Sequence, residues 1–123
     1  MLTQRIYDDR PSRGKNSQTW VLPDGTTLGQ YTIISMLRED NSSITYLARN
    51  TFLDYEVELC EHLPKAFAER NSYTFEVIPT AGNERNYQES LTIFSNTIST
   101  LARQQNPNVA EVLASFSALG TTY

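Results

Sequence analysis

Three segments rich in β-branched and large apolar residues follow one another in the first half of the chain. They cover residues 31–37, 44–48 and 55–62, and their composition is typical of β-strands. Only short polar breaks separate them, and a parallel connection would need a dozen or more residues. The sequence therefore predicts that these strands pair as an antiparallel meander.

A long amphipathic segment follows the meander. Between residues 85 and 104, apolar residues recur at spacings of three and four, which predicts a helix with one apolar stripe. Pro107 ends the segment, because the residue before a proline disfavours the helical conformation. We expect the stripe to pack on the sheet rather than to bind a partner; it consists of Tyr87, Leu91, Phe94, Ile98 and Leu101.

Shorter elements complete the expected fold. Pro64 is suited to the first turn of a short helix over residues 65–70, a β-like run covers residues 75–78, and a fourth strand is expected over residues 109–116. The predicted fold class is α+β, with the long helix on one face of a twisted antiparallel sheet.

Composition excludes several classes of function. The chain has 123 residues, enough for one domain, and a net charge of -4, which argues against nucleic-acid binding. No apolar run is long enough for direct membrane insertion, and the single Cys60 excludes an internal disulfide and a multi-cysteine metal site. We expect no metal and no cofactor. A cytoplasmic location is expected, either alone or as the cytosolic part of a larger or membrane-anchored protein.

The chain divides into two regions by composition. Residues 1–21 are polar and contain Pro11 and Gly14, so we expect a flexible leader. Residues 22–123 form the expected folded domain. Trp20 would be a suitable anchor if the leader were a docking peptide, although an unstructured tail is the simpler interpretation.

The local sequence resembles the small lobe of bacterial Ser/Thr protein kinases over about residues 22–123. Residues 28–33 resemble the approach to the first strand of that lobe, and Ile44 to Ala48 resemble its second strand. Residues 57–64 resemble the third strand, usually written V-A-I-K-E-x-L/F-P. Residues 94–102 resemble the αC helix, and Asn106 to Val109 resemble its exit. Val112 and Phe116 resemble the fourth strand, and Gly120, Thr121 and Tyr123 resemble the turn into the fifth.

The positions of the Gly-rich loop depart from the kinase pattern. The motif G-x-G-x-x-G-x-V falls on Arg38, Asp40, Ser43 and Thr45. Kinases use glycine there because backbone N–H groups must approach the phosphates closely. Arg38, Asp40 and Ser43 all carry side chains, and Asp40 adds negative charge where phosphates would lie.

The lysine and glutamate positions depart as well. The phosphate-binding lysine falls on Cys60 and its αC glutamate partner on Thr97, so both members of the ion pair are lost together. The alanine above the adenine falls on Glu58. Strand alternation places Glu58, Cys60 and His62 on one face. We expect Cys60 to be a structural cysteine rather than a nucleophile paired with His62, His62 to pack rather than bind metal, and the αC helix to be fixed.

The resemblance implies a pseudokinase small lobe without catalytic residues. The chain contains no H-R-D-x-x-x-x-N, D-F-G or A-P-E motif, so we expect no enzyme activity and no ATP binding. Its expected role is that of a protein–protein interaction or regulatory module, and an unpaired last strand would offer an edge for strand addition. The alternatives are a nucleotide-binding sensor without phosphoryl transfer, and the N-terminal fragment of a longer kinase-like membrane or signalling protein.

Overall fold

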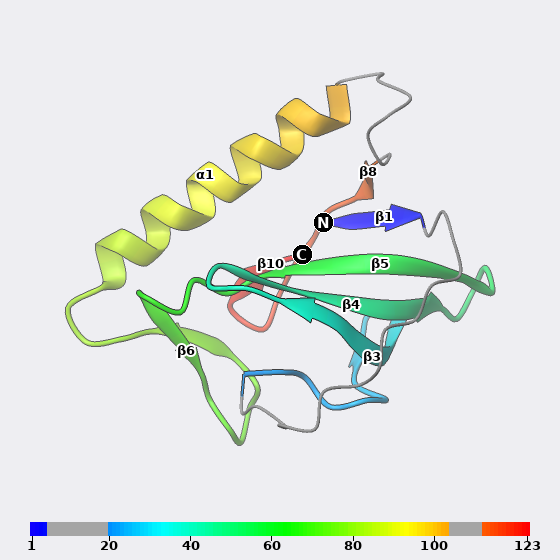
Figure 1. Cartoon of the computed structure of the whole chain (residues 1–123), viewed down its shortest axis with the longest axis horizontal. Helices are drawn as coiled ribbons and strands as arrows, with labels where there is room; N and C mark the ends of the chain where they lie inside the picture. The colour runs from blue at the N-terminus through cyan, green and yellow to red at the C-terminus, as the bar shows by residue number, and fades with distance from the viewer. Residues whose placement is uncertain (5–19, 104–111) are drawn as a thin grey trace.

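The computed structural model describes residues 1–4, 20–103 and 112–123, and within them it contains a curled six-stranded antiparallel sheet, two two-stranded sheets and one long helix (Figure 1). The strand order of the six-stranded sheet is β2-β3-β4-β5-β1-β8. Helix α1 (Glu84–Arg103) lies along one side of it and contacts β8 and β10. The strands of the sheet are β1 (Leu2–Gln4), β2 (Thr27–Leu28), β3 (Tyr31–Glu39), β4 (Ser43–Asn50), β5 (Tyr55–His62) and β8 (Val112–Ala114).

The predicted meander is confirmed by β3, β4 and β5. Strands β4 and β5 pair without interruption from Ser43 opposite His62 to Asn50 opposite Tyr55. The pairing of β3 with β4 is irregular at two places along β3, between residues 33 and 35 and between residues 36 and 38. Such irregularities increase the local twist and bend a strand.

The first strand was not predicted. Sequence analysis assigned residues 1–21 to a flexible leader, but Leu2–Gln4 forms β1, which lies between β5 and β8 and pairs with both. Residues 5–19 lie outside the described residues. Leu2 is followed by polar residues, and its partners are more than fifty positions away in sequence, so no local pattern revealed the strand.

The helix expected over residues 65–70 is a further correction. A single turn follows Pro64, whose carbonyl accepts hydrogen bonds from the amides of Phe67 and Ala68. The chain then forms β6 (Ala68–Arg70), which pairs with β7 (Val77–Pro79). Tertiary contacts of Arg70, described below, override the local helix propensity.

The end of the chain forms a small hairpin, in which strand β9 (Ser117–Ala118) was not predicted, whereas the resemblance had placed a turn at Gly120. Strand β8 falls within the expected fourth strand, whose residues 109–111 lie outside the described part. After it, β9 pairs with β10 (Thr121–Thr122). Gly120 lies between them with a φ of 73°, and a Cβ at this position would lie 2.5 Å from the Val77 carbonyl oxygen. This turn therefore requires glycine.

The apolar core lies against one face of the sheet. Alternate residues of β4 and β5 point into it, among them Tyr46 and Leu59, which are opposite one another in the register. Tyr87 and Ile98 of the helix stripe are buried, and Leu91 packs against the core. The predicted packing of the amphipathic helix on the sheet is thus confirmed.

A buried ion pair sits inside this core. Glu61 of β5 and Arg70 of β6 form a salt bridge with side chains that are 0% and 1% exposed. The Tyr46 hydroxyl donates to Glu61 Oε1 at 2.9 Å, and the Tyr123 hydroxyl donates to Oε2. Burial raises the pKa of Glu61, while Arg70 and the tyrosine hydroxyls oppose that rise. The carboxylate thereby joins β4, β5, β6 and the end of the chain.

Candidate functional site

The opposite face of β4 and β5 carries the positions that the sequence resemblance assigned to nucleotide binding. Alternation along β5 is as predicted: Leu59 and Glu61 point into the core, whereas Glu58 and Cys60 lie half-buried on the other face. In the register, Cys60 is opposite Thr45. We call this surface the candidate nucleotide face; it consists of Arg38, Asp40, Ser43, Thr45, Glu58 and Cys60.

A salt bridge crosses the candidate nucleotide face. Arg38 lies on β3 and Glu58 on β5, and β4 lies between these strands. The Arg38 guanidinium nevertheless reaches Glu58 Oε1 at 2.9 Å. An ion pair this exposed contributes little to stability, but it lays a long side chain across this face. The residue predicted at the first glycine position thus pairs with the residue predicted at the alanine position.

The Asp40 side chain accepts hydrogen bonds from donors within the β3–β4 turn. Asp40 Oδ1 accepts hydrogen bonds from the amides of Ser42 and Ser43, both at 2.8 Å, and from both serine hydroxyls. The amide of Ser42, followed by the other donors, lowers the pKa of Asp40. Backbone amides at this turn would serve a phosphate in a Gly-rich loop. Here the carboxylate takes the place that an anion would occupy.

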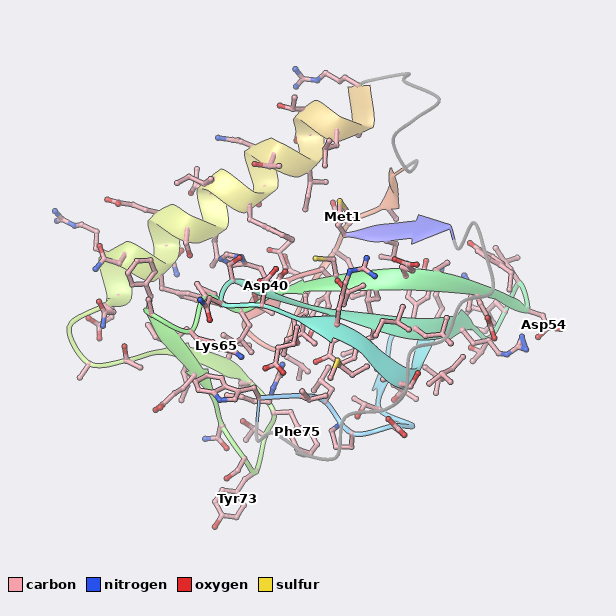
Figure 2. The ribbon with its side chains drawn as sticks, viewed as in Figure 1. Met1, Asp40, Asp54, Lys65, Tyr73 and Phe75 are labelled. Carbon is pink, nitrogen blue, oxygen red and sulfur yellow. The ribbon has the colours of Figure 1, made fainter. Side chains whose placement is uncertain are left out.

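Further hydrogen bonds fix this turn to the chain that follows β5. The amide of Leu63 donates to the Ser42 carbonyl, and the amide of Lys65 donates to the Asn41 carbonyl, both at 2.9 Å. The Lys65 ammonium also pairs with Glu39 at the end of β3. Figure 2 shows Asp40 and Lys65 on neighbouring parts of the molecule. The turn is therefore bonded to the segment that follows β5.

His62 takes part in holding the helix. It is the last residue of β5, its ring stacks on Phe94 at 4.7 Å between centroids, and its Nε2 lies 2.9 Å from the Ser90 hydroxyl. Because that hydroxyl donates to the Tyr87 carbonyl, His62 Nε2 is the donor in the contact with Ser90. This is the packing role that sequence analysis expected for His62.

Thr97 lies apart from the candidate nucleotide face. Its side chain is exposed, and its hydroxyl donates to the Ile93 carbonyl within the same helix. Cys60, in contrast, is half-buried within the sheet, and its backbone exchanges hydrogen bonds with Met1. Of the predicted positions, the structure brings Arg38 together with Glu58, and Asp40 together with Ser43. Sequence reasoning missed both pairings, because the spacing of residue types along the chain reveals neither a shifted strand register nor a hydrogen bond within a turn.

Acid should destabilise the chain through His62. Burial lowers the pKa of His62 from 6.5 to about 4. The unfolded chain takes up a proton below pH 6.5 and the folded chain does so only near pH 4, so stability present above pH 6.5 is lost as the pH falls through this window. The free energy of unfolding should fall between pH 7 and pH 4.5. We expect His62→Phe, which keeps a ring against Phe94, to make that fall smaller by about 1–2 kcal/mol. Urea denaturation of the parent chain and the variant at both pH values measures the two falls in stability. Equal falls would mean that His62 is not the group responsible.

Comparison with known proteins gives one structural relationship. No protein-family model and no curated protein matches the chain. Its structure is similar to the apo form of PpkA-294, a fragment of a bacterial Ser/Thr kinase, with a TM-score of 0.79 and 24% sequence identity. The match covers 83% of this chain and 36% of that one, so the chain spans little more than a third of its neighbour. The chain has a kinase small-lobe-like fold.

This relationship supports the fold and leaves the function open. The predicted α+β class and the small-lobe-like sheet are confirmed, while the identification of α1 with αC stays a prediction. Among the described residues, no three His, Cys, Asp or Glu side chains are grouped so as to hold a metal ion. In the same part of the chain, no helix has both the length and the apolar character needed to cross a bilayer.

Proposed function

We propose that this chain is a non-catalytic, kinase small-lobe-like module that acts by binding a protein partner. The observation that carries the first half is the filled candidate nucleotide face. Asp40 bonds the turn amides that a phosphate would need, and Arg38 and Glu58 join across the place of the base. A nucleotide would have to break these bonds and bring its phosphates beside the Asp40 carboxylate.

The second half rests on a pair of exposed apolar side chains at the β4–β5 turn. Phe52 and Leu53 are 79% and 67% exposed. Their amides donate to Asn50 Oδ1 at 3.0 and 2.9 Å, and the amide of Asp54 donates to the Asn50 carbonyl at 2.8 Å. Two adjacent large apolar side chains exposed on a hydrogen-bonded turn offer a surface that a protein partner could bury, and an ordered turn loses little entropy on binding.

Nucleotide binding is the first test. We expect millimolar ATP, with or without magnesium, to shift the melting temperature by less than a degree. Restoring the ion pair with Cys60→Lys and Thr97→Glu should not create binding, because Asp40 and Glu58 remain and Thr97 lies on the exposed side of α1. Calorimetric titration of the double variant measures this. Micromolar affinity would overturn the occlusion argument and favour a nucleotide sensor.

Partner binding is the second test. With the whole chain as bait, Phe52→Ser combined with Leu53→Ser should abolish capture of any stoichiometric partner and leave the melting temperature within a few degrees of the parent. Tyr73→Ser is the matched control, because Tyr73 is 92% exposed and lies far from the β4–β5 turn marked by Asp54 in Figure 2. Capture that survives the double substitution, or is lost equally in the control, would show that this turn is not the contact.

A further inference from the structure

Strand β1 is short, yet it occupies the interior of the main sheet. It pairs antiparallel with β5, with Leu2 opposite Leu59, Thr3 opposite Glu58 and Gln4 opposite Val57. On its other side it pairs with β8, and the register shifts between residues 2 and 3. Figure 1 shows this first strand beside β5, from the middle of the chain, and β8, from near its end. Three residues thus complete a six-stranded sheet.

Without β1, strands β5 and β8 would face each other across an empty strand position. Each would then present unpaired backbone N–H and C=O groups, which is the arrangement that recruits another extended segment. The position selects its occupant. It requires an apolar side chain where Leu2 is fully buried in the core, and a segment that runs antiparallel to β5.

Met1 adds two backbone hydrogen bonds to this strand. The Met1 nitrogen donates to the Cys60 carbonyl at 2.8 Å, and the Met1 carbonyl accepts from the Cys60 amide at 2.6 Å. Figure 2 shows Met1 at the start of β1 beside the sheet. A segment with a backbone N–H and C=O beside Cys60 and a leucine at the next residue satisfies the whole position. Every copy of the chain carries both this segment and the position that receives it.

Exchange between two copies would therefore keep every contact of β1. Opening a strand of three residues exposes one buried leucine and a few hydrogen bonds, which costs much less than global unfolding. Residues 5–19 separate β1 from Trp20, and a connection of that length reaches about 50 Å when extended. The two chains each carry a net charge of -4, so salt should favour their association by screening.

We propose that the position between β5 and β8 accepts the N-terminal strand of a second copy of this chain, producing a reciprocal strand-exchanged dimer. The bonding partners are the same in the monomer and the dimer, so concentration decides between them. This proposal does not depend on the partner suggested for the β4–β5 turn, because Phe52 and Leu53 take no part in the pairing of β1.

Disulfide trapping between two single-thiol proteins tests it. One copy carries Thr3→Cys and the other Glu58→Cys, each with Cys60→Ser, so a disulfide between positions 3 and 58 joins two molecules. The control copy carries Glu56→Cys instead, because Glu56 lies on the same face of β5 but beyond the residues that pair with β1. A single chain with both thiols, at 3 and 58, verifies the register by closing an internal disulfide in dilute solution.

We expect the 3–58 disulfide in several-fold excess over the 3–56 disulfide, an excess that grows with protein concentration and with salt. Adding Leu2→Asp to the copy that carries the thiol at position 3 should abolish it; Leu2→Thr serves if the aspartate variant fails to fold. Sedimentation of the unmodified chain should show a dimer at the same concentrations. Equal trapping at 58 and 56, trapping that is insensitive to residue 2, or a chain that stays monomeric throughout would each overturn the proposal.

Discussion

Arg70→Met should lower the free energy of unfolding by about 3–5 kcal/mol, because it leaves the Glu61 carboxylate buried without its counter-charge. Two backbone carbonyls lose their donors as well: Arg70 Nε donates to Trp20 and Nη1 donates to Phe75, both at 2.6 Å. Equilibrium urea denaturation of the parent and the variant measures the loss. A change below about 1 kcal/mol would mean that the pair is not buried as the structure has it.

Two further variants show whether charge is the cause. Arg49→Met removes an exposed pair with Asp54, whose side chains are 44% and 84% exposed, and should change stability by about 0.5 kcal/mol or less. Combining Arg70→Met with Glu61→Gln removes the stranded charge. We therefore expect the double variant to be more stable than Arg70→Met alone, because neutral groups cost less to bury than an unpaired carboxylate.

The same ion pair explains why sequence reasoning succeeded in one part of the fold and failed in another. The meander and the long helix depend on local periodicity. The predicted ends of β3, β4, β5 and α1 therefore lie within about two residues of those in the structure. Residues 65–70 also had a local signal, that of a helix. Arg70 instead extends to Glu61, nine positions earlier, and a strand is the conformation that brings it there. A buried charge pair outweighs the small differences in propensity among these residues.

The candidate nucleotide face was also predictable in one respect and not in another. Alternation along β5 correctly placed Glu58 and Cys60 away from the core, because the side-chain period of a strand is fixed. The contacts made by these positions were not predictable. Arg38 reaches Glu58 only because β3 is irregular between residues 36 and 38, and Asp40 binds the turn amides through a geometry that composition does not encode. Strand β1 was the largest omission, since three residues without a turn beside them carry no recognisable signal.

Tyr123→Ala should destabilise the chain by about 3–5 kcal/mol, because it removes a fully buried aromatic side chain. Tyr123 is 0% exposed, its ring stacks on Phe116 at 5.3 Å, and its hydroxyl donates to Glu61. Burial raises the pKa of this hydroxyl, so it stays a donor over the working pH range. Tyr123→Phe keeps the ring and should cost only about 1–2 kcal/mol.

A double-mutant cycle then tests whether the end of the chain and Arg70 act through one carboxylate. Tyr123→Phe and Arg70→Met should be non-additive, because each removes a donor from Glu61 and residues in one hydrogen-bond network couple by about 0.5–3 kcal/mol. Tyr73→Ala, at a tyrosine that is 92% exposed, should be neutral and additive with Arg70→Met. Additive losses for Tyr123→Phe would place its hydroxyl outside the network. Coupling would mean that the last strand pair is anchored by the same buried charge that draws β6 into the fold.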